Sequence, residues 1–509
     1  MKTSIRNALE YRKHRIMKRL RWDDFPPECW QRPLFNAAGV KYELSAKTRA
    51  IAYGGIGVLH RVAEEAGLPQ AINRRLHLLK LHLPYHESDH VLNVAVNALC
   101  EGTCLQDIEL RRNDEGFLDA VGAETIPDPT TAGDFCRRFG EGDVYSLLDA
   151  IDEARLRVWR RQPREFFREA VIDSDGTLVI TRGECKEGMD ISYKGTWGYH
   201  PLVVTLANTR EVLSIVNRSG NRPSHEGAAA EIDRAIALCR RAGFRKVRVR
   251  GDTDFSQTEH LDRWDADLVT FQFGYDAMPN LKELADNLPK SAWKKLARPA
   301  AYRARGPQRA RPARVKLEVI RRREFLHLEL KSEEVAEFKY RPVACQKTYR
   351  MIVVRKNISQ EKGEKRLFDE IRYFFYITND RRSSAAEIVF GCNDRCDQEN
   401  ILAQLAGGVR ALTAPVDNLV SNWAYMVMAS LAWTLKAWTA LLLPVQKRWQ
   451  AKHEEERCKL LRMEFKTFVN AIVKVPCQIV KQARRIIFRV LHWNPHLSTF
   501  FRLCDVLRC

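Results

Sequence analysis

The sequence lacks the cysteine patterns on which small zinc-bound or disulfide-bonded folds depend. It contains 13 cysteines, an odd number, and none of them forms a C-x-x-C pair. Cys100/Cys104 and Cys392/Cys396 are spaced i,i+4, with no second His or Cys pair at zinc-binding spacing. We therefore expect reduced thiols in a cytosolic protein.

Long apolar runs are also scarce. Residues 1–22 are charged throughout and contain no apolar stretch of about 7–15 residues, so we expect no signal peptide. Only Trp423–Leu443, 21 residues long, could span a membrane. It contains Lys436 and follows Asp417 and Asn418, which can cap a helix. We therefore predict a core helix of a large domain and no membrane partner.

Acidic residues are too few to balance the basic ones. The 509-residue chain has 84 Lys and Arg against 64 Asp and Glu, a net charge of +20. Residues 286–366 contain 23 Lys and Arg but nine Asp and Glu, so this segment alone carries +14. Such a charge favours a polyanionic partner, either nucleic acid or an acidic membrane surface. A basic surface without a partner would have the same composition.

The hydropathy pattern divides the chain into regions of different texture. Short β-type runs and helical stretches after residue 165 indicate an α/β domain with a mixed sheet. Beyond residue 285, strand-like runs such as Val315–Ile320 alternate with basic loops, which indicates a β-rich insertion. The expected regions are a helical N-terminal DNA-binding region (1–165), the first part of the α/β core (166–285), the basic β-rich insertion (286–366), the second part of the core (367–445) and a helical C-terminal region (446–509).

Two adjacent arginines in the N-terminal region are candidates for DNA contacts. Thr130 can cap a short helix that carries Phe135 on one face and Arg137 and Arg138 beside it. A DNA-recognition helix has this pattern, and so does an ordinary amphipathic surface helix.

Carboxylates at the ends of expected strands are the candidates for catalysis. An apolar run leads to Asp173 and Asp175, and a second expected strand leads to Asp252. Burial of a carboxylate is costly unless a metal ion or a charged partner compensates for it. Asp173 and Asp175 point to the same side of a strand, so either could serve. Asp254, in the turn after Asp252, is the alternative at the second position and could instead cap a helix.

A third carboxylate lies on an expected helix. Arg395 and Glu399 are four residues apart and hence on one helical face. That spacing alone is typical of a surface ion pair. Together with two strand-end aspartates, however, Glu399 completes a set of hard oxygen ligands from separate elements, as two-metal phosphoryl transfer requires.

Five short motifs follow one another along the chain. They are Asp175-Gly-Thr177, Tyr193-Lys-Gly-x-x-Gly-Tyr199, Ser219-Gly-Asn221, Arg250-Gly-Asp252-x-x-Phe255 and Arg395-x-x-x-Glu399-Asn400. In this order, over residues 170–440, the sequence resembles the DDE transposases of bacterial insertion sequences, and within them the insertion-sequence 1380 group. The 147 residues between Asp252 and Glu399 leave room for an insertion. The related branch has a Tyr and a Lys flanking the Glu, where this chain has Cys392 and Ala406.

The resemblance implies an RNase H-like α/β core interrupted by the basic insertion, in which Asp175, Asp252 and Glu399 hold Mg²⁺, with Mn²⁺ as a substitute. It implies a transposase that cuts double-stranded DNA at terminal inverted repeats and joins the 3′-hydroxyl ends to target DNA. We expect a homodimer on two paired ends and a cytoplasmic, nucleoid-associated protein of a bacterium. Further residues expected at the DNA are Lys194, Arg218, Asn221, Arg250, Arg395 and, as a base-stacking ring, Trp293.

Two other functions fit the same residues. A structure-specific nuclease would use the same core without strand transfer, and a domesticated derivative would bind DNA without catalysis. The basic insertion and the helical N-terminal region favour a protein that recognises DNA ends over a structure-specific nuclease. The presence of all three carboxylates argues against a derivative that only binds DNA. For Trp293, a core or surface position is the alternative to base stacking.

Overall fold

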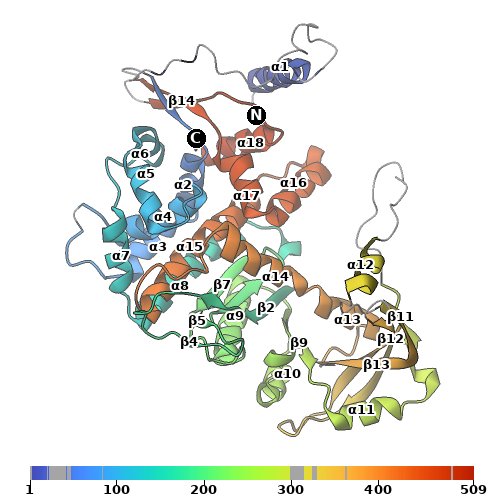
Figure 1. The fold of residues 1–509 in the computed structure, drawn as a ribbon. Helices are drawn as coiled ribbons and strands as arrows, with labels where there is room; N and C mark the ends of the chain where they lie inside the picture. The colour runs from blue at the N-terminus through green and yellow to red at the C-terminus, as the bar shows by residue number, and fades with distance from the viewer. Residues whose placement is uncertain are drawn as a thin grey trace.

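The computed structural model describes residues 3–19, 21, 40, 42, 48–82, 84–298, 315–323, 329–361, 364–482 and 485–509. Its largest feature is a nine-stranded sheet with the order β10-β11-β12-β13-β9-β8-β2-β6-β7 (Figure 1). The strands of this sheet are β2 (Ala170–Gly176), β6 (Leu202–Leu206), β7 (Glu211–Val216), β8 (Val247–Gly251), β9 (Val269–Tyr275), β10 (Lys294–Lys295), β11 (Glu329–Tyr340), β12 (Tyr349–Glu361) and β13 (Glu364–Thr378).

The middle of the sheet is mixed, as predicted. β2, β8 and β9 run parallel to one another, whereas β6 and β7 pair in antiparallel fashion. β6 and β8 are almost wholly buried and rich in β-branched residues, which is typical of strands covered on both faces. Helix α9 (Ala228–Ala242) contacts β2, β6 and β8, and α14 (Cys396–Ala403) contacts β2. The carboxyl ends of β2 and β8 therefore lie at the same edge of the sheet.

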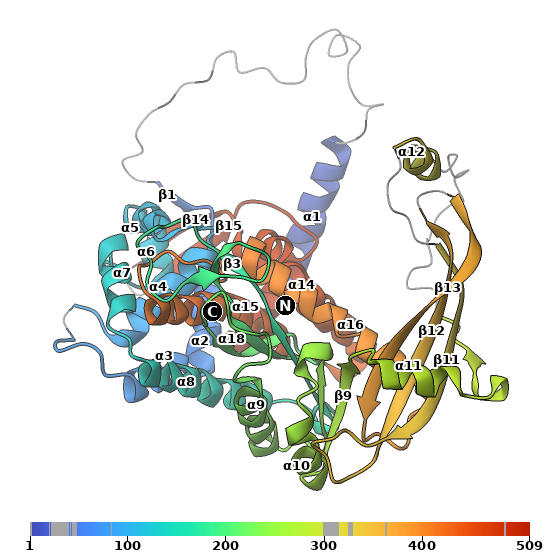
Figure 2. The same ribbon diagram turned by 60° about the horizontal axis from the view of Figure 1, so that its bottom comes forward.

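The segment predicted as a separate β-rich insertion continues the main sheet. β13 pairs with β9 in a register that joins Phe375 to Tyr275, so β10–β13 extend one edge. Figure 2 shows β11, β12 and β13 on the side of the molecule opposite helices α3 (Leu68–Arg75) and α7 (Pro129–Arg137). The predicted strand Val315–Ile320 is wrong, because these residues begin helix α12 (Val315–Arg323). A run this short fits either period, and three arginines in the last turn suit the carboxyl end of a helix.

Most of the remaining elements are helices. The N-terminal helices are α1 (Thr3–Arg19), α2 (Ile56–Glu65), α3 (Leu68–Arg75), α4 (Glu87–Leu99), α5 (Ile108–Arg112), α6 (Glu115–Val121), α7 (Pro129–Arg137) and α8 (Glu141–Trp159). Those after the first half of the sheet are α10 (Leu261–Ala266), α11 (Pro279–Asp286), α13 (Ala385–Asn393), α15 (Leu419–Leu441), α16 (Gln450–Arg462), α17 (Phe465–Phe468) and α18 (Leu497–Leu507).

The C-terminal region is not helical throughout, which corrects the prediction. β14 (Cys477–Gln482) and β15 (Arg485–Val490) form a small sheet with β1 (Arg49–Ile51). In β14 the buried residues Cys477 and Ile479 alternate with more exposed ones, a strand period that the prediction missed. This sheet joins the N-terminal and C-terminal regions.

Helix α15 contains most of the long apolar run. Of its residues, 21 are buried, and it packs against β7, α4, α8 and α16. The prediction of a core helix is therefore confirmed. None of the described helices combines the length and the apolar character needed to cross a membrane.

Candidate active site

Two strands deliver aspartates to one edge of the sheet. Asp175 lies near the end of β2, and Asp252 directly follows β8. Because β2 and β8 are parallel neighbours, both side chains reach the carboxyl edge, where α/β sheets build their sites. Asp252 also caps the short turn after β8, since its Oδ1 accepts the N–H of Asp254 at 3.0 Å. Asp254 itself is exposed.

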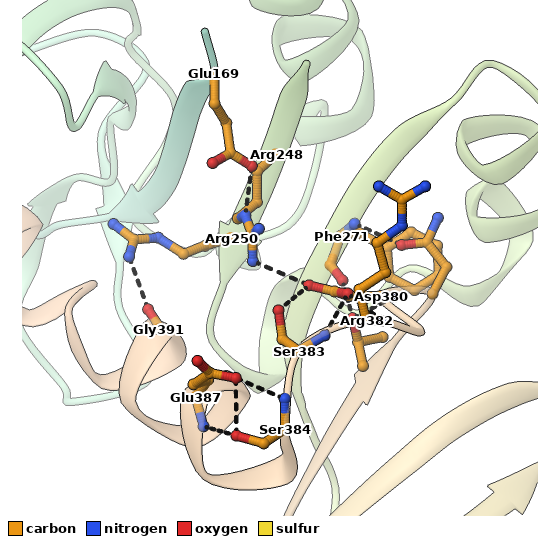
Figure 3. Close-up of polar contacts among 12 residues, drawn as sticks. Glu169, Arg248, Arg250, Phe271, Asp380, Arg382, Ser383, Ser384, Glu387 and Gly391 are labelled. Carbon is orange, nitrogen blue, oxygen red and sulfur yellow. Dashed lines mark hydrogen bonds and ion pairs between the residues drawn. The ribbon is translucent and has the colours of Figure 1, made fainter.

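Asp173 and Asp175 have different partners. Asp173 is 1% exposed, and its two carboxylate oxygens accept hydrogen bonds from Nε and Nη2 of Arg250, each at 2.7 Å. Nη1 of Arg250 donates to the backbone oxygen of Gly391 at 2.7 Å (Figure 3). Asp173 is thus occupied by a buried ion pair, which leaves Asp175 as the carboxylate of β2 that faces the site. Arg250 was predicted to contact phosphate, but this ion pair holds its side chain inside the protein.

Arg395 connects the three candidate carboxylates. Its Nη1 donates to Oδ2 of Asp175 at 3.0 Å, and its Nη2 lies 3.9 Å from Oε1 of Glu399. Burial raises the pKa of Asp252, and the positive charge of Arg395 opposes that rise. Glu399 is 62% exposed on its side chain, whereas Asp175 is 15% exposed. The predicted i,i+4 pairing of Arg395 with Glu399 is therefore confirmed, and the shorter contact of Arg395 is with Asp175.

The negative charges of Asp175 and Asp252 are only partly balanced by positive charge nearby. Burial raises the pKa of Asp175 to about 6, with Arg395 opposing and Asp252 reinforcing the shift. Burial likewise raises the pKa of Asp252, where Arg395 again opposes the shift and Asp254 reinforces it. Arg395 opposes the rise in pKa at both carboxylates. An additional cation nearby would stabilise their ionised forms further.

The start of α13 is fixed to the strands, and this positions α14 (Figure 3). Ser384 and Glu387 form a capping box at the first turn of α13. In the preceding turn, Asp380 accepts hydrogen bonds from the backbone N–H and the hydroxyl of Ser383. Arg248 of β8 contacts Asp380 at 3.5 Å. These contacts hold the helical segment that carries Arg395 and Glu399 against the edge of the sheet.

The residues present suit a hard divalent cation in their chemistry. Asp175, Asp252 and Glu399 offer carboxylate oxygens, the ligands that Mg²⁺ and Mn²⁺ prefer. In the described part of the chain, no three His, Cys, Asp or Glu side chains are close enough together to hold a metal ion. Arg395 lies between Asp175 and Glu399, and its guanidinium group supplies positive charge to both. The chemical type of the three donors therefore fits such an ion.

Three of the predicted DNA contacts lie around the hairpin of β4 (Asp190–Ile191) and β5 (Trp197–Tyr199). Arg218 is 8% exposed and donates to the backbone oxygens of His200, Pro223, Ser224 and Glu226, so it fixes a loop instead of facing solvent. Asn221 donates to Asp190 at 2.7 Å. Lys194 lies in the exposed turn of the hairpin. The prediction did not select Trp197, although it belongs to the motif Tyr193–Tyr199 and is 53% exposed.

The other predicted contacts are far from this hairpin in sequence. Trp293 is 9% exposed, with the guanidinium of Arg355 stacked 4.1 Å from its ring centre, so the core alternative holds. Arg137 pairs with Asp417 at 3.1 Å, and Arg138 lines a surface cleft of about 690 Å³.

The cap of α7 corrects the predicted one. Asp128, and not Thr130, caps this helix, because its side chain accepts the N–H of Thr131 and Pro129 occupies the first helical position.

Comparisons with known proteins match a solved structure and a family model, each over most of the chain. No match is found among curated proteins. Among solved structures, the chain is similar to one described as a cryo-EM structure of piggyBac transposase synaptic complex with hairpin DNA. The TM-score is 0.35 with 11% sequence identity, over 82% of this chain and 83% of that chain. A similarity this low supports no conclusion about this chain. A family model described as Transposase DDE domain group 1 matches residues 47–509.

Proposed function

Because the chain belongs to the family described as Transposase DDE domain group 1, we propose that it is a DNA transposase. It cuts at the terminal inverted repeats of an insertion sequence and joins the freed 3′-hydroxyl ends to target DNA. The observation that carries this proposal is that Asp175 and Asp252 lie at the ends of adjacent parallel strands, while Arg395 contacts both Asp175 and Glu399. Convergent carboxylates from separate elements are what phosphoryl transfer with two metal ions requires.

The proposed core is RNase H-like, and the strand order supports it. β7, β6 and β2 are antiparallel neighbours, and β8 and β9 follow in parallel on the other side of β2. The first aspartate then belongs to the central strand and the second to its parallel neighbour. β10–β13 and the basic loops between them form the proposed insertion between Asp252 and Glu399.

In this proposal Asp175, Asp252 and Glu399 hold Mg²⁺ ions, for which Mn²⁺ can substitute. Bound ions of this kind activate water and stabilise the negative charge that develops when a phosphodiester is cleaved. Asp175 and Asp252 suit the role because burial disfavours their ionised forms unless a cation is near. Glu399 supplies the ligand that is open to solvent, from the helix beyond the insertion.

The neighbouring charged residues position these carboxylates. The Asp173–Arg250 ion pair joins β2 to β8 beside the site and so sets the spacing of Asp175 and Asp252. Arg395 orients Asp175 and Glu399 and is placed to neutralise a phosphate that enters between them.

The proposed partner is double-stranded DNA, at the transposon ends and at the target. The excess of basic residues between 286 and 366 supports it, since each neutralised phosphate releases a counterion. Two ends must be held together for cut-and-paste transposition, so we propose a homodimer in the DNA complex. The predicted contacts that are exposed are Arg137, Arg138, Lys194 and Asn221.

The proposal is tested on a supercoiled plasmid that carries the element with its native flanks. Purified protein is incubated with Mg²⁺ or Mn²⁺, and the products are mapped by sequencing. We expect metal-dependent cuts at the element ends that disappear in Asp252→Ala and in Glu399→Ala while DNA binding is retained. Asp397→Ala is the matched control for Glu399, because Asp397 is an exposed acid on the same helix. This control should leave cleavage unchanged.

Three results would contradict the proposal in different ways. Cleavage that survives Asp252→Ala or Glu399→Ala would mean that another site acts, and cuts without joining would identify a nuclease. Binding to the element ends without cleavage under either metal would identify a DNA-binding derivative. Asp254→Ala separates the two candidates at the second position, since its exposed carboxylate should be dispensable.

A further inference from the structure

The β4–β5 hairpin exposes aromatic and apolar side chains at its tip. The side chains of Tyr193 and Trp197 are 79% and 53% exposed, and that of Ile191 is 48% exposed. Ile191 pairs directly with Trp197 across the two strands, so both project from the same face. A cluster of exposed rings on a short hairpin is costly in water and marks a surface that binds something.

The turn that carries these rings is fixed by its own hydrogen bonds. The N–H of Ser192 donates to the oxygen of Thr196, and the N–H of Gly195 donates to the oxygen of Ser192, each at 2.8 Å. The hydroxyls of Ser192 and Thr196 are 2.7 Å apart. Gly195 has φ of +72°, a conformation that favours glycine. The tip is therefore ordered before any partner arrives.

A second segment braces the hairpin from behind. Asn221 donates to the carboxylate of Asp190 at 2.7 Å. A Cβ on Gly220 would lie 2.4 Å from the backbone oxygen of Asp190 and 2.6 Å from that of Gly198, so only glycine allows this approach. The motif Ser219-Gly-Asn221 thus supports the motif Tyr193–Tyr199, and the two act as one structural unit.

The braced hairpin stands beside the candidate carboxylates. Gly176 follows Asp175, and a Cβ on Gly176 would lie 2.8 Å from Nε2 of His200, which directly follows β5. Burial lowers the pKa of His200, with Lys194 lowering it further and Asp254 raising it, so both charges are near this ring. In Figure 1, β4 and β5 lie on the side of β2, away from β11–β13.

Charge at the tip favours a polyanion. The ammonium group of Lys194 lies 5.3 Å from the ring centre of Tyr193. Within the described ranges, Lys194 has no ion pair with a carboxylate. Exposed rings on the same turn as an exposed cation are the combination that single-stranded nucleic acid binds, because bases stack on rings while phosphates meet the charge.

We propose that Tyr193, Trp197 and Lys194 form a stacking platform for unpaired bases of the DNA strand next to the bond that is cut. The inference rests on the proposed function, since it needs DNA at the carboxylates. A paired duplex hides the faces of its bases, so rings on a rigid tip can stack only where terminal pairs have opened. The platform would therefore hold opened ends and leave intact duplex unaffected.

The experiment compares two duplexes of the element end in the absence of added divalent metal. One is fully paired, and the other is forked, with 2-aminopurine among the unpaired nucleotides at the cleavage position. Binding of the full chain is measured by anisotropy, and stacking is measured by quenching of 2-aminopurine fluorescence. We expect the double variant Tyr193→Ala with Trp197→Ala to bind the forked duplex about tenfold more weakly and to lose the quenching. Binding to the paired duplex should change less than about twofold.

Matched controls test whether any exposed ring matters. Trp449→Ala removes a tryptophan that is 51% exposed and lies outside both the hairpin and the proposed DNA-binding region. This variant should behave like the unmodified chain, and Trp197→Phe should retain most of the quenching. An equal loss on both duplexes, or unchanged binding to the forked one, would overturn the inference. Because the assay needs no cleavage, quenching by a chain that cuts nothing would count against the proposed function alone.

Discussion

Asp173 and Asp175 lie two residues apart on β2, yet their different surroundings give them different roles. Asp173 is sealed in an ion pair with Arg250, whereas Asp175 meets Arg395 at an edge that is open to the site. Loss of one partner from a buried pair leaves the other charge uncompensated, which costs about 3–5 kcal/mol. Loss of an acid that burial already disfavours costs little.

The two aspartates should therefore separate stability from activity. Asp173→Asn should lower the free energy of unfolding by about 3–5 kcal/mol. Asp175→Asn should leave it within about 0.5 kcal/mol or raise it, and should abolish metal-dependent cleavage. Urea denaturation and the plasmid assay check both. Stable, inactive Asp173→Asn together with active Asp175→Asn would reverse the assignment.

Arg395 should affect cleavage more than stability. It contacts Asp175 and Glu399, so Arg395→Ala should slow cleavage at the element ends about 100-fold. Arg395→Lys should be intermediate, because lysine keeps the charge but loses the planar, two-pronged geometry. Arg74→Ala is the control, since Arg74 is an exposed arginine paired with Glu153. Initial rates on the plasmid give the comparison, and equal rates for Arg395→Ala and the unmodified chain would exclude the role.

At the scale of elements, helix α15 contains a buried lysine, which stands out in an otherwise apolar sequence. Lys436 is 1% exposed, donates to the backbone oxygen of Leu461 at 2.7 Å and lies 4.0 Å from the ring centre of Trp433. Burial, with a smaller contribution from Arg210, lowers the pKa of Lys436 from 10.5 to about 7. Between these two values the unfolded chain binds more protons than the folded one, so stability rises with pH across this window.

Lys436→Met should remove that dependence. The variant should be about 1–2 kcal/mol more stable than the unmodified chain at pH 6, where Lys436 is charged in both states. The difference should shrink as pH rises from about 7 toward 10. Lys459→Met, at a lysine whose side chain is 66% exposed, should change stability by less than about 0.5 kcal/mol. Denaturation at several pH values measures this, and a parallel pH profile for Lys436→Met would refute it.

Elements with a strong local pattern could be predicted from the sequence, and those with a weak one could not. The alternation of valine and arginine before Asp252 is a strand period that identifies β8, and the buried length of α15 follows from composition alone. Val315–Ile320 is too short for its period to decide between helix and strand. The attachment of β13 to β9 depends on pairing over about a hundred residues, which no local pattern encodes.

The candidate site divides in the same way. Asp175, Asp252 and Glu399 could be selected because each follows a recognisable local pattern. The burial of Trp293 could not, because it depends on Arg355, which is 62 positions away in the chain. Arg250 was predicted to contact phosphate because its pairing with Asp173 arises only when β2 and β8 lie side by side.

At the scale of the whole molecule, one buried acid links the N-terminal helices, the sheet and α15. Glu211 of β7 is fully buried. It accepts hydrogen bonds from Arg155 at 3.1 Å, from Trp159 at 2.8 Å and from Trp438 at 2.8 Å. Arg155 and Trp159 belong to α8, and Trp438 belongs to α15. A charge shared by three elements couples their unfolding, because its loss removes the carboxylate to which α8 and α15 both donate.

Glu211→Ala should therefore lower the free energy of unfolding by about 3–5 kcal/mol and weaken both helices together. Hydrogen exchange followed by mass spectrometry should show faster exchange in α8 and α15 alike, because both helices donate to the same carboxylate. Glu259→Ala, at a glutamate whose side chain is 69% exposed, should leave both helices unchanged. If only α8 loses protection, the N-terminal helices form a unit that opens independently of the sheet. Joint loss would mean that the DNA-binding region proposed for residues 1–165 cannot move without disturbing β7, the edge strand of the main sheet.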